Sequence, residues 1–144
     1  MPVSENQTSN FPVAQLTVSD TTPIWVYCRQ TGHCQSGMVF AINPGTKLAA
    51  FQAAATAGAA SPSVSSTPAA SPSGTTIPTS TDHRIIVGGT GVIAFNPPNI
   101  TAQVGDTITF EFHQKNHTAT ASSFGAPCVD LLASTGQAGF DSGL

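Results

Sequence analysis

One short segment carries three side chains that bind transition metals. It begins at Cys28 and ends at Met38, with His33 between them. The run 23–28, which leads into it, is continuously apolar and rich in strand formers. The run 38–42, which leads out of it, is apolar and ends at a turn signal, Asn-Pro-Gly. We therefore expect two buried strands joined by a loop that carries the three side chains. Such a loop constrains the whole fold, because any further ligand to a bound metal has to come from elsewhere in the chain.

The ligand types in the loop indicate which metal it would bind. One cysteine and two histidines in a trigonal plane, with a weak axial methionine, form the ligand set of a blue-copper electron-transfer centre. Zinc also accepts cysteine and histidine, but a methionine ligand favours copper. The loop lacks the second histidine, and His117 in the run Lys-Asn-His-Thr is the candidate for it. His113 is the rival, because strand periodicity puts positions 113 and 117 on the same face.

Each candidate ligand also has a simpler interpretation. The alternative for Cys28 is a buried core thiol beside aromatic residues, and the alternative for Met38 is a residue that fills gaps in the core. A lone histidine after an alternating strand, as at His117, is more often a surface or structural residue. His83, which opens a predicted strand, is expected to be structural or exposed. The combination of cysteine, histidine and methionine in one loop favours a copper site over these alternatives.

Composition excludes several classes of protein. The 144 residues suffice for one domain, and a formal net charge of −3 gives no electrostatic footprint for nucleic acid. No apolar run is long enough to span a membrane, and residues 1–5 lack the basic start and apolar core of a signal peptide. Asn6 and Asn99 begin candidate N-glycosylation motifs, and a third motif at Asn116 overlaps the candidate ligand His117 and is expected to be too buried to modify. The N-glycosylation motifs indicate an extracellular or cell-surface protein. Because such a protein needs a signal peptide, we expect this chain to be a fragment.

The chain divides into three parts. Residues 1–50 contain the predicted copper loop and its two strands. Residues 51–82 begin with the end of an Ala-rich stretch, where a short helix is expected over 47–57, and continue into a Ser-, Pro- and Thr-rich linker predicted to be disordered. Residues 83–144 again contain short strand-like runs, and 107–112 alternates with its apolar residues on one face. Many short strands at regular spacing predict an all-β sandwich or barrel.

Three cysteines are an odd number, so they cannot all pair with one another. If Cys28 binds a metal, Cys34 and Cys128 remain and could form one disulfide. The alternative is a disulfide between Cys28 and Cys34 with Cys128 free.

These motifs resemble those of the fungal relatives of the phytocyanins, within the cupredoxin family. The resemblance rests on five short runs: Tyr-Cys at 27–28, His-Cys-Gln at 33–35, Gly-Met-Val-Phe at 37–40, Lys-Asn-His-Thr at 115–118 and Pro-Cys at 127–128. It implies a Greek-key β-sandwich or barrel with one type 1 copper site. Carried over residue by residue, it implies a disulfide between Cys34 and Cys128 and the copper ligands His117, Cys28, His33 and Met38.

The order of the two halves departs from the family. There, the half with the first histidine ligand precedes the half with the Cys-His-Met loop. The resemblance therefore implies a circularly permuted domain, in which residues 83–144 correspond to the N-terminal half and residues 1–50 to the C-terminal half, as in a window cut from a tandem two-domain protein. A flexible linker of this length spans roughly 25–30 Å, so the halves can meet within one chain; the alternative is a domain-swapped dimer. Neither half alone is expected to fold, because each would expose an unfinished sheet edge.

The predicted function is that of a single-electron carrier that binds one copper ion and exchanges electrons with an unknown redox partner, either a protein or a small molecule. An enzyme is not expected, because the sequence lacks the His-x-His pairs of multicopper oxidases. No orienting partner for a Cys–His nucleophile is visible either. The alternative function is a copper-free structural or interaction glycoprotein of the cell surface, which the Ser/Pro/Thr-rich linker and the N-glycosylation motifs favour.

Overall fold

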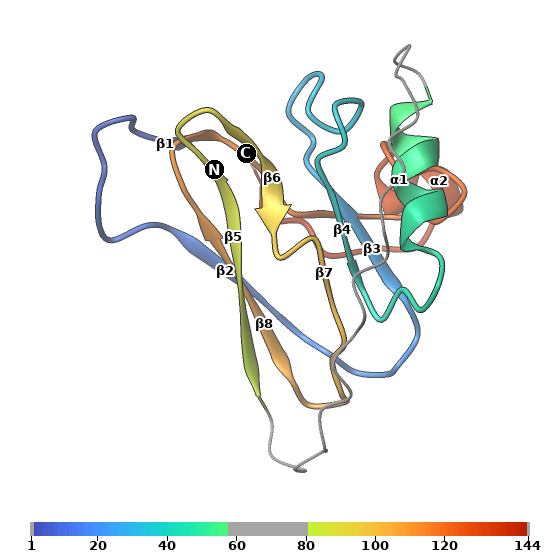
Figure 1. Cartoon of the computed structure of the whole chain (residues 1–144). Coiled ribbons are helices and arrows are strands. Elements are labelled where there is room, and N and C mark those ends of the chain that lie inside the picture. The colour runs from blue at the N-terminus through green and yellow to red at the C-terminus, as the bar shows by residue number, and fades with distance from the viewer. Residues whose placement is uncertain (1, 58–80, 144) are drawn as a thin grey trace.

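Two β-sheets packed against each other form the body of the protein, in a computed structural model that describes residues 2–57 and 81–143 (Figure 1). The first sheet has the strand order β10-β3-β4-β7, the second has the order β2-β8-β5-β6, and a two-stranded ribbon pairs β1 with β9. Neither sheet closes into a barrel within these ranges, and the predicted all-β sandwich is confirmed. The strands are β1 (Pro2–Val3), β2 (Val13–Thr17), β3 (Ile24–Tyr27), β4 (Val39–Ile42), β5 (Asp82–Gly89), β6 (Val92–Asn96), β7 (Asn99–Ile100), β8 (Thr107–Phe112), β9 (Lys115–Asn116) and β10 (Thr120–Ser122).

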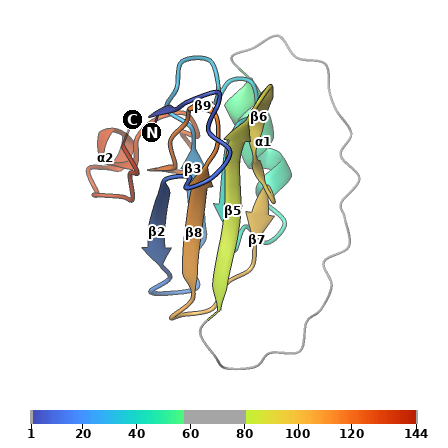
Figure 2. The same cartoon turned by 90° about the vertical axis from the view of Figure 1, so that its left-hand side faces the viewer.

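Each sheet takes strands from both ends of the chain. β2 pairs antiparallel with β8, which pairs in parallel with β5. β3 pairs antiparallel with β10, and β4 pairs in parallel with β7. The two described ends also lie side by side (Figure 2), because Pro2 pairs with Asn116 and the Ser142 amide donates to the carbonyl of Ala119. The parts before and after the predicted linker therefore close on each other as one sandwich.

The core between the sheets follows from the apolar alternation of the strands. In β8, Ile108, Phe110 and Phe112 are fully buried and pack in one cluster with residues of β3, β4 and β5. Thr109 and Glu111 on the opposite face are also nearly buried, with 8% and 9% of their surface exposed. β8 lies between β2 and β5, whose polar side chains cover that face. Alternation in this strand therefore separates apolar from polar surroundings, and both faces are covered.

Helix α1 (Leu48–Thr56) packs on the outer face of the β3–β4 pair. Its Ala-rich sequence has a high helix propensity, and Phe51 and Ala55 are its buried residues. The Phe51 ring lies 4.7 Å from the Trp25 ring, in a second apolar cluster that also contains Tyr27 and Cys34. The helix lies where the Ala-rich stretch predicts it, and the boundary expected at residue 50 falls inside it.

Most of the predicted linker, residues 58–80, lies outside the described residues. β5 begins at Asp82, one position before the boundary expected for the last part of the chain. The sequence does not predict β7, β9, β10 or helix α2 (Leu131–Thr135), because elements of two to five residues are too short for a periodic signal. In the part of the chain that the structure describes, no helix is long and apolar enough to cross a membrane.

Candidate metal centre

The predicted copper loop leaves and returns at one end of the β3–β4 pair. Cys28 directly follows β3 and Met38 directly precedes β4, and the Cys28 amide donates to the Met38 carbonyl at 3.2 Å. Between them the chain folds back, and the Met38 amide donates to the carbonyl of His33 at 3.0 Å. Gly32 and Gly37 have φ angles of 79° and 95°, which residues with a Cβ rarely adopt. These turns bring His33 back beside Cys28.

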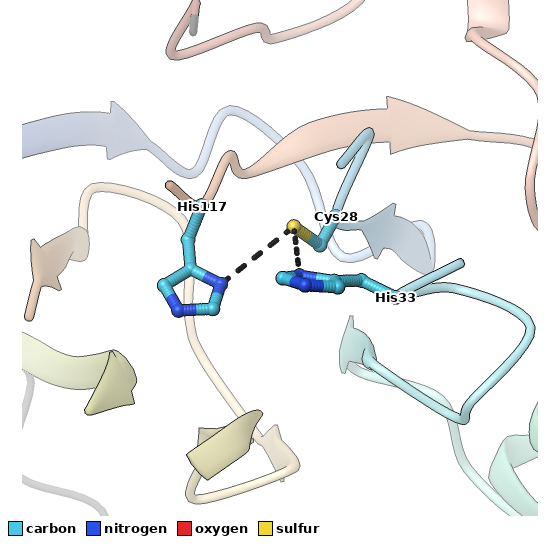
Figure 3. Close-up of side chains that lie close together, drawn as sticks. All are labelled: Cys28, His33 and His117. Atoms are coloured by element: carbon cyan, nitrogen blue, oxygen red, sulfur yellow. Dashed lines mark hydrogen bonds between the residues drawn. The ribbon is translucent and has the colours of Figure 1, made fainter. Parts of the chain in front are cut away.

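His117 approaches the same sulfur from the other part of the chain (Figure 3). The Cys28 Sγ lies 3.5 Å from the Nδ1 of His33 and 3.9 Å from the Nδ1 of His117. The ligand atoms of the three residues all lie within 4.8 Å of one another. Among the described residues, this is the group of His, Cys, Asp and Glu side chains arranged to hold a metal ion. The sandwich thus brings together one thiol and two imidazoles, the equatorial donors that the sequence predicts.

Met38, the predicted axial ligand, is fully buried in the core between the sheets. Its backbone is hydrogen-bonded to both Cys28 and His33, which keeps it beside the other two candidate ligands of its own loop. Its coordination to copper remains a prediction.

His113 does not belong to this group. Its Nε2 lies 2.8 Å from the Glu111 Oε1, and its ring stacks on Phe11 with the centroids 3.9 Å apart. Strand periodicity does not extend from position 113 to 117, because β8 ends at Phe112 and the chain turns at Lys115, where φ is 77°. The periodicity that made His113 a rival is therefore broken by this turn.

A disulfide joins Cys34, next to His33, to Cys128, with the Cα atoms 5.7 Å apart. This is the pairing that the family resemblance implies, and it leaves Cys28 as a free, buried thiol. The bond spans a sequence separation of 94 and constrains the unfolded chain by roughly 4–5 kcal/mol in the loop-entropy model. It therefore ties the copper loop to the segment that follows β10.

Gly88 in β5 lies directly against the His117 ring. Its φ is +75°, and a Cβ at this position would lie 2.1 Å from the His117 Nε2 and 2.2 Å from its Cδ2. No side chain fits there unless the ring moves. The metal-binding motifs in the sequence do not include Gly88. The Gly-Gly pair at the end of a strand-like run is a signal for it, since glycine in a strand often marks a close approach of another group.

Thr118 connects the two segments that carry the candidate ligands. Its amide donates to the Cys28 Sγ at 3.4 Å, and its hydroxyl oxygen accepts a hydrogen bond of 2.8 Å from the Arg29 amide. Two hydrogen bonds thus join the residue after His117 to Cys28 and its neighbour. Hydrogen bonding around the cysteine sulfur is one of the factors that tune the potential of a blue-copper site.

Burial dominates the electrostatics of the centre. It raises the pKa of the Cys28 thiol, so the thiol keeps its proton more readily than in water. Burial lowers the pKa of His33, and burial together with the neighbouring His33 lowers the pKa of His117 to about 4. Both imidazoles are therefore neutral near pH 7, the form in which histidine binds metals. A bound cation would deprotonate the thiol, so the donor set fits a metal that accepts sulfur and nitrogen.

The centre lies near the surface, beneath the turn between β5 and β6. A cavity of about 150 Å³ adjoins the rings of His33 and His117. Val92 and Ile93 on its wall are 46% and 47% exposed. The remaining lining residues are Gly89, Gly91 and Lys115.

The three N-glycosylation motifs differ in exposure. Asn6 is exposed in the segment between β1 and β2, whereas Asn99 is half-buried in β7. Asn116 is exposed as well, but Thr118, the third residue of its motif, is fully buried. Asn6 is therefore the most accessible of the candidates.

Comparison with known proteins found similarity over part of the chain. The probable GPI-anchored cupredoxin-1 of Arthroderma benhamiae is 47% identical to the chain over 47 residues, which cover 30% of this chain and 25% of that protein. Over these 47 residues the chain is therefore similar to a protein named as a cupredoxin. The matched region spans only a quarter of the length of this relative. No protein-family profile and no solved structure matches the chain.

Proposed function

We propose that this cupredoxin-like chain binds one copper ion in a type 1 site and acts as a single-electron carrier, not as an enzyme. The observation that carries the proposal is the approach of two imidazole Nδ1 atoms to one buried sulfur, at 3.5 and 3.9 Å. Cys28, His33 and His117 would form the ligand plane, and Met38 would be the weak axial ligand. The finer assignment, a phytocyanin-like domain with its halves in permuted order, is supported by sheets that combine strands from both ends of the chain.

The chain's own residues suit an ion that changes charge by one electron. When bound, copper would supply the one-electron couple. The thiolate and the thioether favour Cu(I), whereas the two imidazoles serve both oxidation states. The ligand loop is held by its turns, by the ladder hydrogen bond between Cys28 and Met38 and by the disulfide beside it. A loop held in this way limits rearrangement of the ligands between the two oxidation states.

Electron exchange with a redox partner would take place on the side of the centre that adjoins solvent. There the half-exposed Val92 and Ile93 lie beside the cavity next to the two imidazole rings. An extracellular or cell-surface location is part of the proposal. It is supported by the disulfide, which persists in oxidising compartments, and by a similar protein described as GPI-anchored.

Addition of Cu(II) to the purified, metal-free protein tests the proposal. We expect an intense thiolate-to-copper absorption band in the visible spectrum, together with the EPR signal of a type 1 site. The Cys28→Ser variant should lose the band, because the oxygen of serine cannot replace the sulfur in this transition. A folded wild-type sample that develops no such band would contradict the proposal.

A second candidate function is a structural or interaction glycoprotein of the cell surface that uses the same fold without copper. The exposure of Asn6 in its N-glycosylation motif favours it. Native protein recovered from culture would then carry a glycan at Asn6, contain no copper and be stable without it. A metal content near one copper per chain would count against this function.

A further inference from the structure

Four residues next to the metal centre form a closed ring of hydrogen bonds. The Asp141 carboxylate lies 2.5 Å from the Arg29 Nη1 through one oxygen and 3.1 Å from the Thr120 hydroxyl through the other. The hydroxyls of Thr120 and Thr118 are 3.1 Å apart, and Thr118 accepts from the Arg29 amide at 2.8 Å. The ring therefore begins at the Arg29 side chain and ends at the backbone of the same residue.

The carboxylate sets the direction of these hydrogen bonds. A carboxylate only accepts, and a threonine hydroxyl has a single proton to donate. Thr120 therefore donates to Asp141 and accepts from Thr118, which in turn accepts from the Arg29 amide. All donors point the same way along the chain of hydroxyls, and such aligned hydrogen bonds strengthen one another.

The ring of hydrogen bonds adjoins both segments that carry the candidate ligands. Arg29 follows Cys28 in the sequence and Thr118 follows His117, so the ring holds the two ligand-bearing segments together. The Thr118 amide also donates to the Cys28 Sγ at 3.4 Å. Thr118 and Thr120 are 0% and 1% exposed, so water does not replace a lost partner easily. A shift of Thr118 would change both the spacing of the ligands and the hydrogen bond to the sulfur.

We propose that Thr120 and Asp141 are positioning residues of the metal centre, which act on Cys28 and His117 through Thr118. The proposal rests on the proposed function, because it assigns these residues to the same copper site. Neither residue offers a ligand to the ion.

The second sheet supplies a matched control. There the Thr109 hydroxyl donates to the Asp82 Oδ1 at 2.7 Å, and Thr109 is 8% exposed. This pair has the same chemistry as Thr120 and Asp141. It lies in the sheet that does not carry Cys28 and His33. The Thr109 hydroxyl also accepts from the Gln15 Nε2 at 3.3 Å, as the Thr120 hydroxyl accepts from Thr118. Thr109→Val therefore measures the cost of losing a buried threonine hydroxyl that donates to an aspartate and accepts from a second side chain.

The experiment compares Thr120→Val, Thr120→Ser and Thr109→Val in the full chain. Three quantities are measured: the affinity for copper, the position of the thiolate-to-copper band, and the hydrogen exchange of the Arg29 and Thr118 amides in the metal-free protein. We expect Thr120→Val to lower copper affinity by about 10–100-fold, the usual cost of removing a group that orients metal ligands. It should also shift the band and speed exchange of both amides. Thr120→Ser keeps the hydroxyl and should restore all three quantities, and Thr109→Val should leave them at the wild-type values.

Asp141→Ala provides the same test at a partly exposed position, should Thr120→Val fail to fold. It removes both acceptor oxygens and is expected to change the three quantities in the same direction. The proposal is overturned if these variants lower only the thermal unfolding midpoint, as Thr109→Val does, and leave copper affinity unchanged. If the wild-type protein itself binds no copper, the proposed function fails. Amide exchange in the metal-free protein then decides the positioning role, and wild-type exchange rates in Thr120→Val overturn it.

Discussion

The four histidines of the chain form two pairs with opposite surroundings. His33 and His117 face a thiol sulfur, at 3.5 and 3.9 Å. His83 and His113 each face a carboxylate oxygen instead, at 2.9 and 2.8 Å. A carboxylate at one ring nitrogen does not by itself exclude metal binding through the other, because metal-ligating histidines often donate to a carboxylate. What sets the first pair apart is that both of its rings lie beside the same sulfur. The convergence of two imidazoles on one thiol, and not the presence of a histidine near a strand end, therefore marks the candidate ligands.

Substitution of one histidine from each pair by alanine should give the largest difference in copper affinity. His117→Ala removes a proposed ligand, so copper affinity should fall by more than the roughly 10–100-fold that loss of an orienting group costs. His113→Ala should retain the affinity and the thiolate-to-copper band. Titration of each metal-free variant with Cu(II) measures both. Equal losses in the two variants would contradict the division of the histidines.

A substitution at Gly88 tests how tightly the fold holds the His117 ring of the first pair. Gly88→Ala introduces a Cβ 2.1 Å from the His117 Nε2, and the displaced ring should lower copper affinity by about tenfold or more. Gly91→Ala is the matched control, because its φ of +72° is nearly the same and nothing lies within 4 Å of the added Cβ. Both variants carry a left-handed backbone cost of about 1 kcal/mol. Wild-type copper affinity in Gly88→Ala would show that the ring has room to move.

Asp106 tests the carboxylate side of the comparison. Hydrogen bonds from the amides of Gln103 and Thr81 and from the His83 ring lower the pKa of Asp106 from 3.8 to about 2. Its ionised form therefore contributes stability that is present above pH 3.8 and is lost as the pH falls through about 2.

Asp106→Asn should lower the free energy of unfolding at pH 7 by about 2 kcal/mol, the scale of hydrogen bonds to a charged group. The variant should also lack this part of the acid dependence. Urea unfolding at a series of pH values measures both. Copper affinity at pH 7 is expected to stay at the wild-type value, and a large loss of affinity would show that the two histidine pairs are coupled.

The metal-free protein should also show a pH dependence of stability between pH 6.5 and about 4. Burial lowers the pKa of His117 from 6.5 to about 4, so within this window the unfolded chain binds a proton that the folded chain does not. Stability should therefore fall as the pH falls through the window. His117→Gln should remove this part of the dependence, as measured by unfolding at pH 7 and pH 5. An unchanged slope in this variant would mean that His117 takes up its proton in the folded state.

Local sequence patterns predicted the strands and the helix that are long enough for their residue pattern to repeat. The apolar runs at 23–28 and 38–42 correspond to β3 and β4, and the alternating run at 107–112 coincides with β8. The Ala-rich stretch gave rise to α1 because helix propensity is a local property. The short strands β7 and β9 gave no such signal, because two residues do not establish a period. They form only because long-range neighbours supply their hydrogen bonds.

The sequence by itself determined the donor chemistry of the candidate site. Cys28, His33 and Met38 occur in one loop, and their atom types favour copper whatever the rest of the chain does. Only the tertiary structure separated His117 from His113 on geometric grounds, through a break in the strand at Lys115 and a carboxylate that faces His113. It also decided that Gly88 packs against the ring of His117, a candidate ligand. The physical reason is that donor type is a property of one side chain, whereas its direction and its partner depend on backbone breaks and on strands that meet from opposite ends of the chain.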